Sequence, residues 1–243
     1  MKNFIVIFNL ILSISFFGNL EAQKINGVKI GGQVWSEKNL DVGVFQNGEK
    51  IKEAKTYLEW KKACESRQPA WCYYKFSPLN GIKYGKLYNW FAIVDLRGIA
   101  PAGWEIPAYS DFEVLENAIK DPSNKIIKEQ IYNSPVTVGY KLKSKTDWKV
   151  YQGQNGNGNN QYNFNAIPGG YVWLANVSKT GYVEGIDFLG KGEETYFWTK
   201  DSDNFNYHLS NGWFSSETSG FVPPSASFCC KETFGYYVRC IQK

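Results

Sequence analysis

The single histidine is the first residue of this sequence to consider for chemistry. His208 lies in the segment "FNYHLSNGW", between residues that have the pattern of a strand. A Ser/His/Asp or Cys/His enzyme would have to use this side chain, because the sequence contains no other histidine. The surrounding pattern favours a half-exposed histidine on a strand, and we therefore expect no such catalysis.

Four carboxylates near one another in the chain are the second group: Glu193, Glu194, Asp201 and Asp203. Two carboxylates can cleave a glycosidic bond when one donates a proton and the other attacks the sugar or activates water. Acidic clusters of this kind are usually solvated turns. We therefore assign no catalytic residues and expect the protein not to be an enzyme.

The third group is the five cysteines, Cys64, Cys72, Cys229, Cys230 and Cys240. Their spacing, with the single histidine, provides no four-ligand zinc set, so disulfides are the expected use. A bond between the adjacent Cys229 and Cys230 would be strained, so at most one of them should pair with Cys240. Cys64 could pair with Cys72, or Cys72 with Cys240, and one of the five would stay free.

The N-terminus has the pattern of a signal peptide. Lys2 precedes an apolar run from Phe4 to Phe17, and Ala22 is a small residue suited to cleavage. The run is shorter than the roughly twenty apolar residues of a membrane span. We expect residues 1–22 to be removed on export and residues 23–243 to form one domain at the cell surface, outside the cell or in the periplasm.

The charges give a further exclusion. The formal net charge is +4, and the Lys and Arg residues are scattered with no basic block. Nucleic-acid-binding domains usually cluster these residues on one face. We therefore exclude nucleic acid as a partner.

Two segments carry the signals of amphipathic helices that could position these groups. In the first, Thr56 and Glu59 form a capping box ahead of apolar residues at helical spacing. In the second, Pro107 keeps the chain extended, and Ser110 and Glu113 form another capping box. Both helices should cover a sheet with their apolar faces.

Short strands and loops account for the rest of the chain. Residues 28–42 alternate like two strands around a glycine turn, and residues 83–95 could be a strand or a buried helical turn. Residues 151–170 are rich in Gly and Asn, which is typical of a long loop. Five later segments have strand patterns: 170–174, 185–190, 195–200, 206–210 and 236–243. This order of elements indicates an α+β fold.

Four segments are distinctive: "KYGKLYNWFA", "AGWEIP", "FNAIPGGYVW" and "FGYYVRCIQK". In this order, they resemble the Fibrobacter succinogenes major paralogous domain (FISUMP) family, and the resemblance covers nearly the whole mature chain. It implies a C-type-lectin-like fold, with two helices packed on a twisted, mainly antiparallel sheet and with long loops. It also implies an exported protein of the Bacteroidota or Fibrobacteres, but no particular activity.

Calcium-dependent sugar binding is a further possibility that such a fold raises. C-type lectins hold calcium with Glu-Pro-Asn and Trp-Asn-Asp motifs, and this sequence contains neither. Asp201, Asp203 and Asn204 offer three oxygen ligands, whereas calcium takes about six to eight. The copper-binding cysteine pair of the formylglycine-generating enzymes also has no counterpart around Cys229 and Cys230. We expect no cofactor, with calcium as the open alternative.

The function that remains is binding. Long loops on a rigid sheet are common ligand sites, and "GNGNNQYN" and "SNGWFSSETSGFVPPSASF" fit that description. The expected binding residues are Trp198, Asp201, Asp203, Asn204, Trp213 and Phe214. We expect a non-enzymatic exported module that binds another exported or outer-membrane-associated protein, in an adhesion or secretion assembly. A carbohydrate-binding module is the alternative.

Overall fold

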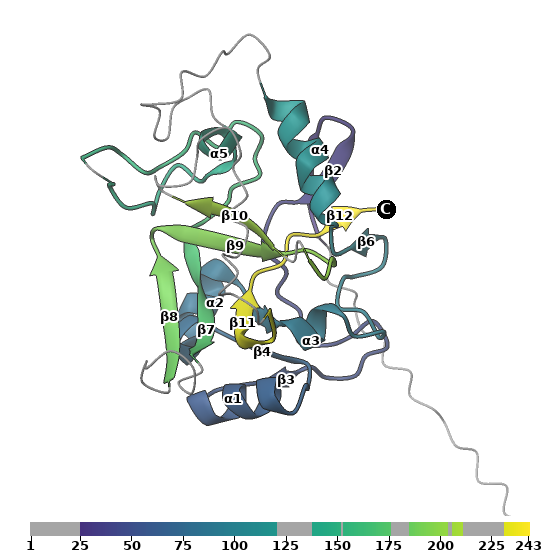
Figure 1. Cartoon of the computed structure of the whole chain (residues 1–243). Helices are drawn as coiled ribbons and strands as arrows, with labels where there is room; N and C mark the ends of the chain where they lie inside the picture. The colour runs from purple at the N-terminus through teal and green to yellow at the C-terminus, as the bar shows by residue number, and fades with distance from the viewer. Residues whose placement is uncertain (1–24, 121–137, 152, 176–184, 204–205, 211–230) are drawn as a thin grey trace, which may run out of the picture.

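The computed structural model describes residues 25–120, 138–151, 153–175, 185–203, 206–210 and 231–243 (Figure 1). The expected signal peptide lies outside these residues. Within them the chain is a mixed α+β structure with five α-helices and two mainly antiparallel sheets. The helices are α1 (Tyr57–Glu65), α2 (Pro78–Tyr84), α3 (Trp90–Ile93), α4 (Tyr109–Ile119) and α5 (Val138–Leu142). Two short 3₁₀ helices are η1 (Tyr74–Phe76) and η2 (Lys231–Thr233).

The smaller sheet joins the two ends of the described chain. Its order is β1-β2-β12-β6, so the C-terminal strand lies between a strand from the N-terminal region and one from the middle of the chain. The strands are β1 (Gly27–Ile30), β2 (Gln33–Ser36), β6 (Trp104–Glu105) and β12 (Ile241–Gln242). The expected hairpin at Gly31-Gly32 is confirmed by the antiparallel pairing of β1 and β2.

The larger sheet has the order β10-β9-β7-β11-β5-β4-β3, and β8 also pairs with β7. The β3–β4 and β7–β9 pairs are parallel, and the other pairs are antiparallel. Its strands are β3 (Lys52–Glu53), β4 (Ala70–Cys72), β5 (Leu87–Asn89), β7 (Gly169–Ala175), β8 (Gly185–Lys191), β9 (Glu194–Trp198), β10 (Asn206–Ser210) and β11 (Phe234–Tyr236). Residues 83–95 thus contain both expected alternatives, a strand followed directly by a helical turn.

The two faces of the larger sheet belong to two hydrophobic cores, because successive side chains of a strand point to opposite faces. On β7, Val172 and Leu174 lie in the first core, and Tyr171 and Trp173 pack against the second. The largest first-core side chains include Trp35, Trp60, Phe112, Phe197 and Tyr237. The second core includes Trp71, Tyr88, Trp90, Trp104 and Trp198.

Helix α1 forms as its sequence predicts. The Thr56 hydroxyl accepts a hydrogen bond from the Glu59 N–H at 3.3 Å, and the Glu59 carboxylate accepts one from the Lys55 N–H at 2.6 Å. Trp60 and Cys64 are buried in the first core. In Figure 1, α1 and α4 lie at opposite ends of the molecule.

The capping box predicted for α4 is wrong, because the helix begins earlier than predicted. The helix begins at Tyr109, and the Asp111 carboxylate accepts from the Ala108 N–H at 2.7 Å, so Ser110 and Glu113 lie inside the helix. The predicted apolar face is confirmed, since Phe112, Leu115 and Ile119 are buried.

A buried arginine connects three distant parts of the chain. Arg239 is almost fully buried, and its guanidinium donates to three backbone carbonyls at Ser36, Glu37 and Phe164. It also donates to the Asn39 side chain at 2.9 Å and to the Asn165 carbonyl at 3.1 Å. Burial lowers the pKa of Arg239 to about 9. Neutral acceptors therefore replace the water that this cation loses on folding.

The expected disulfides among the described cysteines are absent. Cys64, Cys72 and Cys240 are free and buried, so neither the Cys64–Cys72 nor the Cys72–Cys240 disulfide is present. The second pair is separated by the sheet, because Cys72 belongs to the first core and Cys240 to the second. Cys229 and Cys230 lie outside the described residues. Within the described part of the chain, no helix has the length and apolar character of a membrane span.

Candidate binding surfaces

Trp198, the aromatic residue expected to contact a ligand, is fully buried. Its indole N–H donates to the Tyr88 carbonyl at 2.7 Å. Its ring centroid lies 4.6 Å from that of Tyr236 and 5.5 Å from that of Trp90. Trp198 is therefore a residue of the second core and offers no surface to a partner.

The expected acidic residues do not form one site. The Asp201 carboxylate accepts from the Tyr109 N–H at 2.5 Å, which gives the first turn of α4 an acceptor and a favourable negative charge. Asp203 is exposed and accepts from the Ser202 hydroxyl at 3.1 Å. Glu193 pairs with Lys149 at 2.8 Å. Asn204, Trp213 and Phe214 lie outside the described residues.

Metal binding gains no support from the part of the chain that the structure describes. In that part, no group of three or more His, Cys, Asp and Glu side chains is arranged to hold a metal ion. The role of Asp201 as a helix cap also removes one of the three oxygen donors considered for calcium.

The asparagine-rich loop, expected as a free binding loop, is attached to α5. Its positive φ angles at Asn160, Asn163 and Asn165 explain the choice of residue, because asparagine tolerates left-handed conformations. Four consecutive N–H groups of the loop donate to carbonyls of α5 and its C-terminal extension. These pairs are Gly158 to Ser144, Asn159 to Tyr140, Asn160 to Lys143 and Gln161 to Lys141. The loop therefore provides hydrogen-bond donors for the carbonyl groups at the C-terminal end of α5.

His208 is buried, and the prediction of a half-exposed side chain is wrong. Its ring stacks on Tyr196 of the neighbouring strand, with centroids 4.1 Å apart and planes 10° apart. Burial lowers the pKa of His208 to about 3. The imidazole is therefore neutral at physiological pH.

A surface that the sequence reasoning missed lies on the second face of the larger sheet. We call Tyr171, Trp173, Tyr196, Phe234 and Tyr236 the aromatic sheet face. The Tyr171 centroid lies 4.9 Å from that of Tyr196 and about 6 Å from those of the two β11 rings. Tyr171, Trp173 and Tyr196 are partly exposed, whereas Phe234 and Tyr236 are buried. The alternating aromatic residues of "GYVWL" and "TYFWTK" were the signal that could have identified it.

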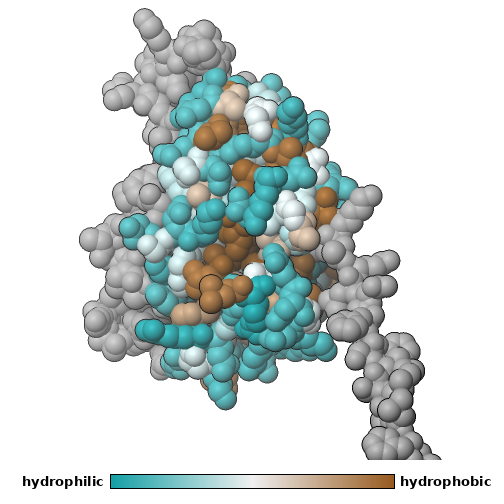
Figure 2. Space-filling view, turned by 90° about the vertical axis from the view of Figure 1, so that its right-hand side faces the viewer, coloured by the Kyte–Doolittle hydropathy of each residue, from teal (hydrophilic) through white to brown (hydrophobic). Residues whose placement is uncertain are grey.

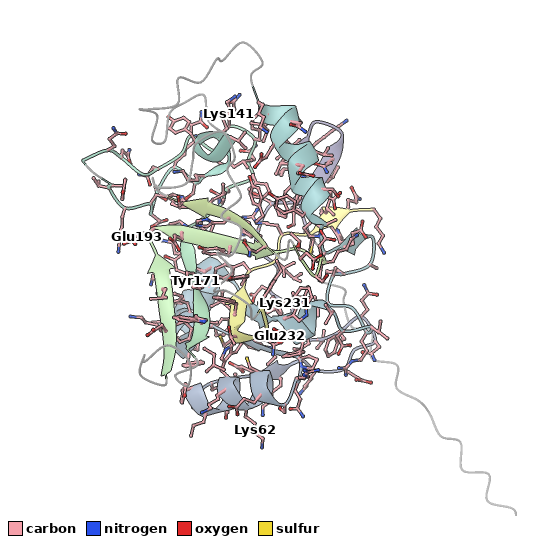
Figure 3. The ribbon with its side chains drawn as sticks, viewed as in Figure 1. Lys62, Lys141, Tyr171, Glu193, Lys231 and Glu232 are labelled. Atoms are coloured by element: carbon pink, nitrogen blue, oxygen red, sulfur yellow. The ribbon has the colours of Figure 1, made fainter. Side chains whose placement is uncertain are left out.

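Carboxylates border the exposed part of the aromatic sheet face. Asp187 is exposed and lies opposite Trp173 in the β7–β8 pairing, and Glu194 precedes Tyr196 by two residues on β9. Burial raises the pKa of Tyr171, and the charges of Glu194 and Asp187 raise it further. Burial also raises the pKa of Glu194, while its hydrogen bond with Tyr196 acts in the opposite direction. Figure 3 shows Tyr171 of β7 next to β8, with Lys231 and Glu232 near β11.

A second exposed surface lies at α3 and the residues that follow it. The Asn89 side chain accepts from the Ala92 N–H at 3.1 Å and so starts this short helix. Phe91 is partly exposed, Val94 is exposed and Leu96 is fully exposed, and we call these three residues the α3 patch. Figure 2 views the side toward which α3 and β6 lie and shows hydrophobic side chains gathered within a hydrophilic surround.

Ion pairs hold the chain beside the α3 patch. Arg97 donates to both carboxylate oxygens of Asp95 at 2.8 Å and also pairs with Glu49. Its guanidinium lies 3.8 Å from the centre of the Phe45 ring. These contacts hold the loop that carries Leu96 in one conformation. The α3 patch therefore has charged groups at its border.

Comparison with known proteins and protein families identifies the family of this chain but not its ligand. No curated protein and no solved structure matches the chain. The model of one protein family, described as the Fibrobacter succinogenes major domain, matches residues 28–242. With almost the whole described chain inside this match, the protein belongs to the Fibrobacter succinogenes major domain family.

Proposed function

We propose that this chain is a non-enzymatic exported binding module that contacts another exported or outer-membrane-associated protein through the α3 patch. The observation that carries the proposal is the full exposure of Leu96 beside the exposed Val94. An apolar surface with a polar border is typical of protein interaction sites, because burying it in a partner removes it from water. The aliphatic side chains lack the polar atoms that a sugar ligand would need.

Two further observations favour binding over catalysis. The single histidine is buried in the sheet, and Asp201 and Glu193 have separate structural partners. We also propose that the fold is C-type-lectin-like. Its support is the pairing of the C-terminal strand β12 with β2 of the N-terminal region, together with the helices α1 and α4 that cover the first core.

A capture experiment with the mature chain tests the proposed function. The purified protein is immobilised, an envelope fraction is passed over it, and the bound proteins are compared with those bound by the Leu96→Ser variant. We expect at least a tenfold loss of one captured protein, because a central interface side chain commonly contributes about 2 kcal/mol.

The matched control is Ile82→Ser. Ile82 is also an exposed aliphatic residue, but it lies on α2, which contributes to the first core on the other face of the sheet. We expect this variant to capture the same protein as the unchanged chain. Equal losses for both variants, or no loss for Leu96→Ser at unchanged melting temperature, would overturn the proposal.

A further inference from the structure

We infer that the aromatic sheet face is a second binding site, separate from the α3 patch, and that it takes a glycan of neutral pyranose units. Its exposed part is formed by Tyr171, Trp173 and Tyr196. The two β7 rings are two residues apart and so point to the same side, about 7 Å from each other along the strand. Two neighbouring rings on one surface can contact successive units of a linear glycan.

The chemistry of these residues matches the two kinds of surface that a pyranose offers. The C–H face of the sugar is apolar and packs on an aromatic ring, while the hydroxyls around its edge need hydrogen-bond partners. Asp187 and Glu194 provide carboxylate acceptors beside the rings. The Tyr171 hydroxyl adds a group that can both donate and accept, whereas the Tyr196 hydroxyl already donates to Glu194.

The local charges select among glycans. Asp187 and Glu194 are close enough to Tyr171 to raise the pKa of its hydroxyl. The nearby cation of Lys231 is directed elsewhere, since it donates to the Ser202 carbonyl at 2.9 Å and lies 4.7 Å from the centre of the Trp90 ring. A negative border repels uronic acids and sulfated sugars, so a neutral glycan is the better fit.

A protein ligand fits this surface less well than a sugar does. The exposed aliphatic residue at its border is Leu189, opposite Tyr171 on β8, whereas the other named side chains are rings and carboxylates. The α3 patch has the opposite composition, with two exposed aliphatic residues at its centre. The two surfaces therefore suit different classes of ligand.

Affinity electrophoresis of the mature chain tests this inference. The protein is run in gels that contain galactomannan, xyloglucan or hydroxyethylcellulose as neutral polysaccharides, and polygalacturonate as the acidic one. We expect at least one neutral polysaccharide to retard the protein. Trp173→Ala should raise the dissociation constant at least tenfold, and Asp187→Asn two- to tenfold.

Two controls separate this result from folding and from the proposed protein site. Asp187 is exposed, so its substitution should leave the melting temperature unchanged even if Trp173→Ala lowers it. Leu96→Ser should bind the polysaccharide as the unchanged chain does. The inference is overturned if no neutral polysaccharide retards the protein, if both sheet-face variants bind normally, or if polygalacturonate alone binds.

Discussion

The two faces of the larger sheet use the same aromatic residues in different ways. In the first core, on one side of the sheet, Trp60 of α1, Phe112 of α4 and Tyr237 are fully buried. On the second face, burial is graded, from the fully buried Trp198 to the partly exposed Tyr171 and Trp173. An aromatic count therefore says little about function here, because the position of a ring on the sheet decides whether it is enclosed in a core or stays partly open to solvent.

Of the substitutions that test this comparison of the two cores, the removal of Arg239 should have the largest effect on stability. Arg239→Ala removes the donor of five acceptors, three of them in buried hydrogen bonds, which should cost about 3 to 5 kcal/mol of unfolding free energy. Denaturant unfolding followed by tryptophan fluorescence measures the loss. The control is Arg97→Ala, whose solvent-exposed ion pairs should contribute far less to stability. Similar losses for both variants would show that Arg239 is not central to the fold.

The second test concerns the close approach of β7 to β8 at Gly170. Gly170 has a φ of +71°, and a Cβ there would lie 2.1 Å from the Leu189 carbonyl oxygen. Gly170→Ala should therefore destabilise the protein by more than about 2 kcal/mol. At Gly32 a Cβ would meet no described atom within 4 Å, so Gly32→Ala should change stability by less than about 1 kcal/mol. Thermal unfolding of the two variants checks the difference, and a tolerated Gly170→Ala would contradict the close approach of β7 to β8.

The third test is a pH dependence that comes from the second face. His208 has an ordinary pKa of 6.5 when unfolded and about 3 when folded, so between these values the unfolded state binds more protons. Stability should fall as the pH is lowered through this window, by about 2 kcal/mol between pH 6.5 and pH 5. His208→Gln should flatten the curve in urea titrations. An unchanged slope in that variant would assign the effect to other groups.

The last test concerns the reactivity of the thiols in the two cores, where the expected effect is the smallest. Burial raises the pKa values of Cys64 and Cys240 to about 12, and that of Cys72 is also raised by burial. In a Cys229→Ser/Cys230→Ser background, native protein should react with a thiol reagent only at its global unfolding rate. Three thiols per chain should then react in denaturant. Earlier labelling of Cys240 alone would show that the second core opens locally.

Local patterns predicted the local parts of this structure. Thr56 and Glu59 identified the start of α1, and the glycine pair at residues 31 and 32 identified the first hairpin. Long-range contacts decided the rest. The start of α4 combines a local contact, from the Ala108 N–H to the Asp111 carboxylate, with a distant one to Asp201, 92 positions away from Tyr109. No local pattern could reveal the second contact.

The candidate surfaces were harder to predict than the elements. The alternation in "TYFWTK" places Phe197 on one face of the sheet and Tyr196 and Trp198 on the other. It does not indicate that Trp198 is buried and Tyr196 is partly exposed. That difference depends on Trp90 and Tyr236, which contact Trp198 from elsewhere in the chain. The same limit applies to Cys72 and Cys240, since spacing alone could not assign them to two different hydrophobic cores.

The contacts of Arg239 also determine when the protein can fold. This residue reaches acceptors about 200 positions earlier in the chain, and β12 completes the smaller sheet between β2 and β6. The smaller sheet therefore cannot be completed until Arg239 and β12 have been synthesised. Folds dominated by such distant contacts form slowly, because a long loop must close before any contact compensates for the lost chain entropy. Until β12 arrives, the earlier residues therefore lack the contacts that complete the smaller sheet.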